Sequence, residues 1–299
     1  MQPLPALITL HHPPTYSPSP EDIFSTTLGS LFPDDLQNQH GDADADAVIV
    51  YASRRLGDLE FRTADVHGEE QRTKFAHYLW NAGVLMAELV AGREGDGDDG
   101  EWWLSREEEG KWDVQGEKVL ELGAGVGLAG IAAALSGAHA VAISDYPAPP
   151  ILDAIKTNVT KNIPNNIKPS VTIEGHKWGD LSTPFAQQHA HSFTRILAAD
   201  CYWMPHEHDN LARSMTHFLS ESPEARVLCI GGFHTGRAKI AGFFEEAVPE
   251  AGLEVEEIFE MDATGQRREW RPVRDGGRED IGERKKWLVL ARLRRAKKQ

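Results

Sequence analysis

The sequence predicts an α/β fold with a Rossmann-like, seven-stranded, mostly parallel sheet, an antiparallel C-terminal edge pair and helices on both faces. Short apolar runs alternate with helical stretches from residue 118 onward, and strands that alternate with helices pair in parallel. The runs are continuously apolar, which is typical of strands that are covered on both faces. A glycine-rich turn follows the first run, where such sheets carry their ligand sites.

The chain divides into an N-terminal extension of residues 1–46 and a domain of residues 47–299. The extension mixes Pro, Ser, Asp, Gln and His with one apolar patch at 23–32, which suits a short helix. We expect most of this arm to be loosely ordered. Residues 47–66 predict two strands around Leu56-Gly57-Asp58, a hairpin that leads into the domain.

Two further segments precede the alternating region. Apolar residues recur at three and four spacing from Glu69 to Val90, which predicts one amphipathic helix. Residues 91–112 are rich in glycine and acidic residues and predict a surface insertion, in which Trp102 and Trp103 serve as anchors.

The alternating region supplies the sheet. Strands are predicted at residues 118–122, 140–144, 171–175, 195–199, 226–231, 253–261 and 287–293. Helices are predicted at residues 128–136, 151–161, 208–220 and 238–248. The last two strands have no helix between them, so we expect them to form the antiparallel edge pair.

Composition excludes several classes of function. The chain has 31 basic and 46 acidic residues, and its net charge of -15 has the wrong sign for direct nucleic-acid binding, so a basic partner is favoured. No apolar run approaches the roughly 20 residues that span a bilayer, and the N-terminus lacks the basic start of a signal peptide. Two isolated cysteines fit a reducing compartment. We expect a cytoplasmic monomer without a metal site, because the 13 histidines are scattered.

The strongest local signal is the loop after the strand at 118–122. Gly123, Gly125 and Gly127 let the backbone turn sharply and approach a ligand where any Cβ would clash. The following helix directs its first N–H groups toward the same place. A ligand site is therefore predicted at the carboxyl ends of the strands.

The type of ligand is less clear from the loop alone. Gly125 to Gly130 also spells GxGxxG, the dinucleotide pattern, so an NAD-dependent oxidoreductase is an alternative. The turn, however, begins earlier, at Gly123. Glu121 would also place an anion beside the pocket, which disfavours a pyrophosphate and favours a cationic cofactor.

Three further strand ends carry polar or aromatic residues. Asp145 ends the second strand, where its carboxylate can accept ribose hydroxyls or cap a turn. Trp178 follows the third strand and can stack on an adenine or belong to the core. Asp200 follows the fourth strand and precedes two aromatic residues.

Taken together, ELGAGVG, Asp145, HKWGD and AADCYW, with the upstream segment YLWNAG, resemble the seven-β-strand methyltransferases. The likeness is greatest to the family that methylates lysines and other amines of non-histone proteins. It implies S-adenosyl-L-methionine as cofactor. The residues that it implies for cofactor binding are Trp80, Gly123, Ala124, Gly125, Asp145, Trp178 and Ala199. Glu121 is a further candidate from its position beside the loop. Without the resemblance, Trp80 would be interpreted as a core residue of the helix.

The resemblance also implies a substrate site. The family carries an Asp-x-x-Tyr-like motif, whereas here the aromatic residues stand two and three positions after Asp200, so Tyr202 and Trp203 are both candidates. Within the family, the fungal branch that methylates the N-terminal glycine and adjacent lysine of translation elongation factor 1-alpha is most similar, which implies that partner. A small-molecule N-methyltransferase, such as one for nicotinamide, and a catalytically inactive binding module are the alternatives.

Overall fold

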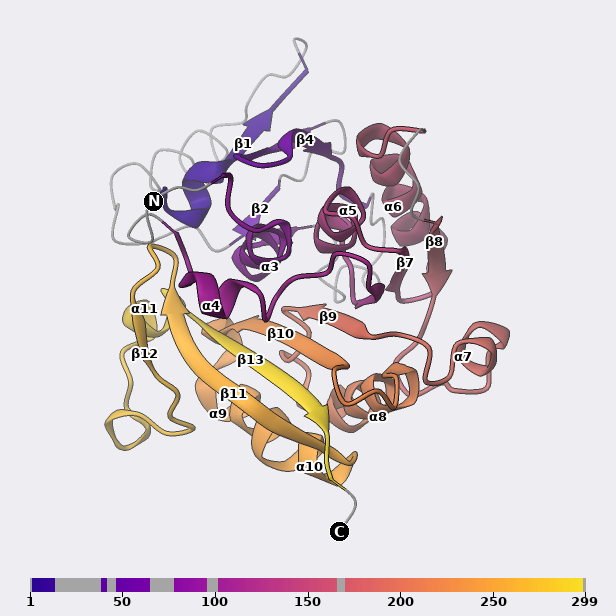
Figure 1. Ribbon diagram of the computed structural model, residues 1–299. Coiled ribbons are helices and arrows are strands. Elements are labelled where there is room, and N and C mark those ends of the chain that lie inside the picture. Colours follow the sequence, from indigo (N-terminus) through magenta and orange to yellow (C-terminus); the bar gives the residue numbers. More distant parts are fainter. Residues whose placement is uncertain are drawn as a thin grey trace.

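A computed structural model describes residues 2–13, 39–41, 47–64, 78–95, 102–165 and 170–297. In this part of the chain the main sheet has eight strands in the order β12-β11-β13-β10-β9-β6-β7-β8 (Figure 1). Their bounds are β6 (Lys118–Leu122), β7 (Ala140–Asp145), β8 (Ser170–Gly175), β9 (Arg195–Ala199), β10 (Arg226–Gly232), β11 (Leu253–Asp262), β12 (Arg267–Glu269) and β13 (Trp287–Arg295).

The pairing confirms the predicted sheet. Strands β8, β7, β6, β9 and β10 are parallel neighbours. Strand β13 pairs antiparallel with both β10 and β11, which forms the C-terminal edge. The sequence did not indicate β12, a strand of three polar residues that pairs antiparallel with β11. So short and polar a segment carries no apolar pattern.

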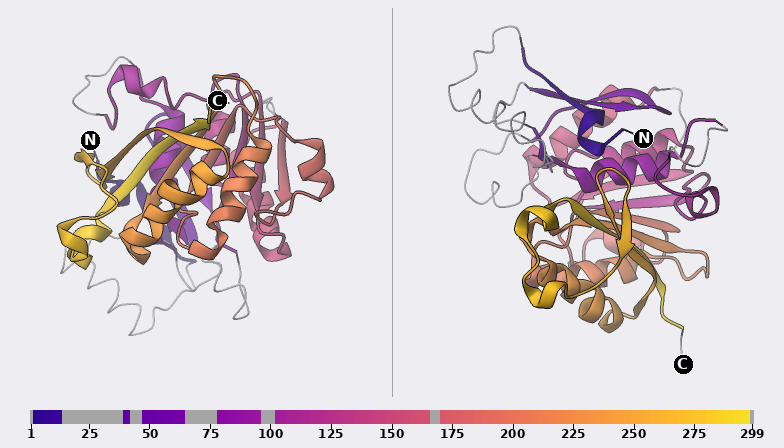
Figure 2. Two further views of the ribbon diagram at one scale, coloured as in Figure 1. Left: turned by 90° about the horizontal axis from the view of Figure 1, so that it is seen from below. Right: turned by 90° about the vertical axis from the view of Figure 1, so that its left-hand side faces the viewer.

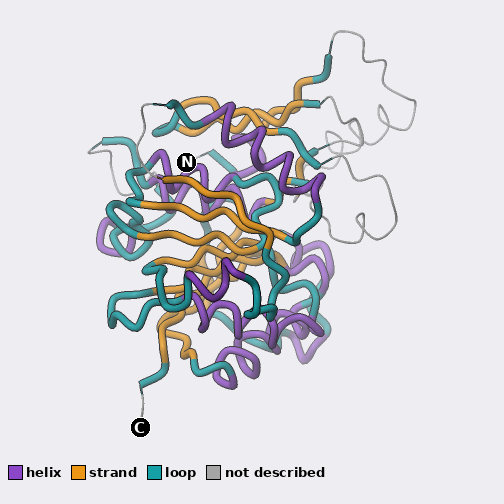
Figure 3. The backbone as a smooth tube through the Cα atoms, turned by 90° about the vertical axis from the view of Figure 1, so that its right-hand side faces the viewer, coloured by secondary structure: helices purple, strands orange, loops and turns teal. Residues whose placement is uncertain are grey.

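Helices cover both faces of the sheet, as Figures 2 and 3 show. Strand residues alternate between two cores: Val119 packs into one cluster and its neighbour Leu120 into the other. The first cluster includes residues of α3 (Asn81–Ala91), α5 (Leu128–Leu135) and α6 (Pro149–Asn162). The second includes residues of α7 (Pro184–Gln188), α8 (His208–Phe218), α9 (Arg237–Gly242), the π-helical turn η5 (Phe243–Ala247) and α10 (Val248–Glu250).

The described part of the N-terminal extension packs against the domain. The short helix η1 (Leu4–Leu7) buries Leu4 and Leu7, and β1 (Ile8–His11) pairs antiparallel with β3 (Val48–Ser53). Strand β3 in turn forms the predicted hairpin with β4 (Gly57–Phe61). The apolar patch at 23–32, for which a helix was expected, lies outside the described residues.

The helix predicted over residues 69–90 is confirmed at its C-terminal half, where α3 spans Asn81–Ala91. Residues 65–77 lie outside the described residues. Leu79 and Trp80 instead form β5 (Leu79–Trp80), because β2 (Gln39–His40) offers it a backbone partner. His40 Nε2 also lies 2.8 Å from the side-chain oxygen of Asn81. Trp80 therefore precedes the helix.

The acidic insertion is anchored at its described ends. Trp103 and Trp112 are buried in the first core, and the indole N–H of Trp103 donates to Glu88 at 3.3 Å. Trp102 packs against the same core and is only partly buried. The remaining short helices are α4 (Arg106–Glu109), η3 (Pro205–Glu207), η4 (Phe233–Thr235), η6 (Asp275–Gly277) and α11 (Ile281–Lys285).

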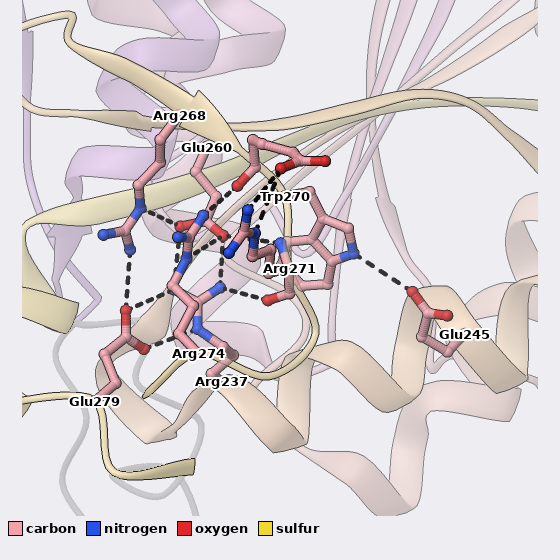
Figure 4. A network of polar contacts seen from close by, with 9 residues as sticks. Arg237, Glu245, Glu260, Arg268, Trp270, Arg271, Arg274 and Glu279 are labelled. Carbon is pink, nitrogen blue, oxygen red and sulfur yellow. Dashed lines mark hydrogen bonds and ion pairs between the residues drawn. The ribbon is translucent and has the colours of Figure 1, made fainter. Parts of the chain in front are cut away.

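A network of arginines and glutamates ties the edge strands to α9 (Figure 4). Arg237 donates to Glu260 at 2.6 Å and to Glu279 at 2.7 Å, and Arg268 donates to Glu260 at 2.6 Å. The side chain of Glu260 is fully buried. Because buried carboxylates are stable only when paired, this network holds β11, β12 and α9 in one arrangement. No described helix is both long and apolar enough to cross a membrane.

Candidate active site

A cleft opens at the carboxyl ends of β6, β7 and β9, against β5 and the start of α3. Every predicted site residue except Tyr202 lines it. These are Trp80, Glu121, Gly123, Ala124, Gly125, Asp145, Trp178, Ala199, Asp200 and Trp203.

The glycine loop has the geometry that its sequence predicts. Gly123, Gly125 and Gly127 have φ angles of +66°, +56° and +81°, a left-handed region that other residues rarely adopt. A Cβ on Gly123 would lie 2.8 Å from Cys201 Sγ and 3.0 Å from the Trp178 ring. The backbone thus passes so close to Cys201 and the Trp178 ring that no side chain fits at Gly123.

The three glycines of the GxGxxG pattern have two different roles. Of its three glycines, only Gly125 lines the cleft. Gly127 is the N-cap residue of α5, and Gly130 lies where α5 packs against the sheet. A Cβ on Gly130 would lie 2.6 Å from Glu121 Oε2 and 2.7 Å from Ile143 Cγ1. Two of these glycines therefore serve the fold and not a pyrophosphate.

Asp145 braces the loop from the end of β7. Its Oδ2 accepts a hydrogen bond from the Gly125 N–H at 2.7 Å, and its Oδ1 accepts one from Tyr146 N–H at 2.6 Å. The contact to Tyr146 is the turn-capping role that the sequence allowed. Asp145 also lines the cleft, and a carboxylate is a suitable acceptor for ribose hydroxyls.

Glu121 departs from the sequence analysis. Its side chain is buried and accepts the Gly130 N–H at 2.9 Å. Burial raises the pKa of Glu121 to about 8, the nearby Asp145 charge raises it further, and the Gly130 hydrogen bond opposes the shift. A raised pKa lessens the negative charge of this carboxyl at neutral pH, which weakens the argument that a fixed anion beside the pocket favours a cationic cofactor.

His176 supports the turn that carries Trp178. Its Nε2 lies 3.0 Å from Ser214 Oγ, which also accepts the Gly179 N–H at 2.9 Å. Burial lowers the pKa of His176 to about 4, so the ring is neutral. The sequence analysis did not assign these residues, because their pairing depends on how α8 packs beside β8.

A second group of cleft residues is acidic and aromatic, and we call Trp80, Asp200, Trp203, Met204 and Glu207 the mouth. Asp200 has a φ of +57°, a strained backbone that often marks functional sites, and its Oδ1 accepts the Gly232 N–H at 3.1 Å. Burial raises the pKa of Asp200, and nearby His234 opposes this shift. The Trp80 ring stacks on His234 with centroids 4.7 Å apart, and Tyr78 meets Trp80 edge-on at 6.0 Å. Trp203, Met204 and Glu207 complete this mouth.

Tyr202 does not belong to the mouth. Its ring is buried against Phe243, with centroids 4.7 Å apart, and its hydroxyl donates to Ala198 O at 2.8 Å. Gly231 leaves room for the ring, since a Cβ there would lie 2.6 Å from Tyr202 Cδ2. Of the two aromatic candidates, only Trp203 faces the cleft.

Tyr78 and His234 were not assigned from the sequence. Tyr78 stands within the YLWNAG segment, and His234 follows β10, whose carboxyl end lies at the same edge of the sheet as the cleft. That position was the signal that could have indicated His234. Within the described residues, no group of three His, Cys, Asp or Glu side chains could hold a metal ion.

A glycine loop, an acid at the next strand end and an aromatic, acidic mouth along one sheet edge define an S-adenosylmethionine-dependent methyltransferase. Residues 63–247 match the family model described as lysine methyltransferase, which is more than half of the chain. The protein therefore belongs to the lysine methyltransferase family, and it is an enzyme that uses S-adenosyl-L-methionine. The NAD-dependent alternative is not retained.

Curated relatives carry matching names. The protein N-terminal and lysine N-methyltransferase EFM7 of Gibberella zeae is 32% identical over 62% of this chain and 68% of its own length. The protein of the same name from Schizosaccharomyces pombe is 28% identical over 64% and 69%, respectively. Protein N-lysine methyltransferase METTL21A of Danio rerio is 34% identical over 53% and 62%. The match to the protein of the same name from Aspergillus fumigatus spans 56% of that protein, and the match to the one from Emericella nidulans spans 57%.

Solved structures share the fold. A methyltransferase in complex with S-adenosylhomocysteine aligns with a TM-score of 0.55 at 12% identity, over 91% of this chain and 65% of that one. An S-adenosylmethionine-dependent methyltransferase from Streptococcus mutans aligns with a TM-score of 0.51 at 11% identity, over the same shares. At this identity the likeness concerns the arrangement of strands and helices alone.

Proposed function

We propose that this enzyme methylates the N-terminal glycine and the adjacent lysine of translation elongation factor 1-alpha. The observation that carries the proposal is that one cleft is lined both by the glycine loop and by Trp80, Asp200 and Trp203. Residues suited to the cofactor and residues suited to an amine thus share one space. The names of the relatives support an N-terminal amine and a lysine as the two targets.

The residues of the cleft fit the cofactor. Gly123, Ala124 and Gly125 would hold its methionine part, and Asp145 its ribose. Trp178 would flank the adenine, with the backbone of Ala199 beside it. Trp80 would also contact the cofactor. When bound, the cofactor supplies an electrophilic methyl group, to which the amine nitrogen bonds while the carbon–sulfur electron pair stays on sulfur.

The mouth suits an amine. Aromatic faces and carboxylates attract an ammonium group, and Asp200 is the buried carboxylate that faces it. The amine must become neutral before it can attack the methyl carbon. An N-terminal α-amine has an ordinary pKa near 8 and a lysine near 10.4, so the N-terminal glycine is the easier nucleophile.

The charge of the chain supports a basic protein substrate. At -15 the enzyme can steer a basic partner toward its acidic rim. Both cysteines are free and buried, which suits the reducing cytoplasm, and we place the reaction there with the enzyme as a monomer.

Mass spectrometry of the target tests the proposal. Purified elongation factor 1-alpha is incubated with S-adenosyl-L-methionine and the wild type, the Asp145→Ala variant or the Asp153→Ala variant. Asp153 is exposed on α6 and serves as the matched control. We expect methyl additions on the N-terminal peptide with the wild type and Asp153→Ala, and none with Asp145→Ala. Nicotinamide methylation without any addition to the protein would instead favour the small-molecule alternative.

A further inference from the structure

His234 connects the two residues that flank the mouth. Its ring stacks on Trp80 with an interplanar angle of 18°, and its Nδ1 lies 3.9 Å from Asp200 Oδ2. The other oxygen of Asp200 is already engaged by the Gly232 N–H. Asp200 therefore contacts the imidazole through Oδ2 and also lines the cleft.

We propose that His234 is a positioning residue that receives, through Asp200, the proton that the substrate ammonium must lose before methyl transfer. This inference rests on the proposed function, because it requires an amine substrate in the mouth. It assigns a role to a residue outside the cofactor loop, in the turn η4 that follows β10, whereas Asp200 follows β9.

The proton balance is simple. The ammonium donates one proton to the Asp200 carboxylate and becomes a neutral amine with a free electron pair. The proton then passes to Nδ1 of His234, which becomes an imidazolium while Asp200 regains its negative charge. The imidazole is 20% exposed, so it can release a proton to water. A separation of 3.9 Å is an ion-pair distance, and such contacts commonly shorten when a substrate is bound.

The fold holds His234 in place from several sides. Gly232 leaves room for the ring, since a Cβ there would lie 3.0 Å from His234 Nδ1. Arg284 of α11 donates to Phe233 O at 3.1 Å, and the guanidinium of Arg237 lies 4.1 Å from the Phe233 ring centroid. The network of Figure 4 in turn fixes Arg237 through Glu260 and Glu279.

The helices packed against η4 carry Arg237 and Lys239 on α9, and Glu283, Arg284 and Lys285 on α11. Asp200 favours the protonated imidazole, whereas Arg237 and Arg284, which both contact Phe233, oppose it. The charge of Arg237 is paired with the carboxylates of Glu260 and Glu279. Asp200 is therefore the charge whose removal should affect His234 most.

The pH dependence of turnover tests the proposal. The variants are His234→Gln, which removes the ring, and His234→Phe, which keeps a ring for Trp80 but accepts no proton. The control is His139→Gln, an exposed histidine at the turn before β7. With a peptide of the elongation factor N-terminus at pH 7, we expect kcat to fall roughly 100-fold in both His234 variants.

This loss should shrink as the pH approaches 9.5, because the α-amine then deprotonates by itself. His139→Gln should follow the wild type, and all variants should bind S-adenosylhomocysteine with unchanged affinity. A defect that stays constant across pH, or a His234→Phe variant with wild-type turnover, would show that the histidine serves only packing.

A second measurement does not depend on the substrate. The ring chemical shifts of His234 are recorded by NMR in the wild type and in Asp200→Asn. Loss of the carboxylate 3.9 Å from Nδ1 should change these chemical shifts, and unchanged shifts would overturn the proposal. If the wild type shows this coupling but methylates no elongation factor peptide, then the proposed function fails while the Asp200–His234 pair stands.

Discussion

Replacement of Glu121 by glutamine should remove a pH-dependent cost to folding. The wild-type carboxyl is buried at the start of the cofactor loop, with a pKa raised from 4.5 to about 8. In the unfolded chain it ionises near its ordinary value. Below pH 4.5 the group is protonated in both states and costs nothing. As the pH rises from 4.5 toward 8, the folded state must keep a proton that the unfolded state loses, so stability falls.

The magnitude follows from the pKa shift. One pKa unit corresponds to about 1.4 kcal/mol, so the full shift amounts to about 5 kcal/mol above pH 8. Between pH 5.5 and pH 8.5, about 3 kcal/mol of this cost accrues. Glutamine keeps an oxygen that can accept the Gly130 N–H but does not titrate, so the variant should escape the cost.

Urea unfolding at pH 5.5 and pH 8.5 measures the effect. The free energy of unfolding of Glu121→Gln, relative to the wild type, should rise by about 3 kcal/mol between the two pH values. Glu107→Gln, at an exposed position of α4, is the control and should follow the wild type. Parallel curves for the wild type and Glu121→Gln would refute the raised pKa and would restore Glu121 as an anion beside the cofactor.

Three further predictions follow from the packing and the site. Gly130→Ala should destabilise the protein by about 1–3 kcal/mol in thermal or urea unfolding, because its Cβ would lie 2.6 Å from Glu121 Oε2; Gly242→Ala, which meets nothing within 4 Å, should not. Glu260→Gln should cost about 3–5 kcal/mol of unfolding free energy, because it leaves the paired arginines of Figure 4 without their buried charge; an unchanged unfolding curve would refute that role. Tyr202→Phe should lose about 1 kcal/mol of stability, because the hydrogen bond to Ala198 O is lost, but should keep normal turnover in a methyl-transfer assay. A large loss of kcat would show that the Tyr202 hydroxyl takes part in the reaction.

The sheet could be predicted because burial on both faces makes its strands continuously apolar. The runs at β6 and β9 match the described strands residue for residue. Elements held by pairing alone could not be predicted. Strand β12 is polar, and β5 depends on a partner about forty residues upstream in the chain, at β2.

The sequence could predict those cleft residues that stand at the carboxyl ends of parallel strands. Gly123, Asp145, Trp178 and Asp200 each stand after a parallel strand, and the topology brings such positions to one edge. The direction of single side chains was not predictable. Tyr202 is directed into the core because Gly231 of a neighbouring strand makes room for it. Likewise, the pKa of Glu121 depends on a burial that its sequence position does not reveal.

The most direct test is a crystal structure of the enzyme with S-adenosylhomocysteine and a peptide of the elongation factor 1-alpha N-terminus. The account predicts ribose hydroxyls on the Asp145 carboxylate, adenine beside Trp178, and the peptide α-amine in the mouth between Trp80 and Asp200. A cofactor bound away from the glycine loop, or a peptide whose amine lies outside the mouth, would contradict it.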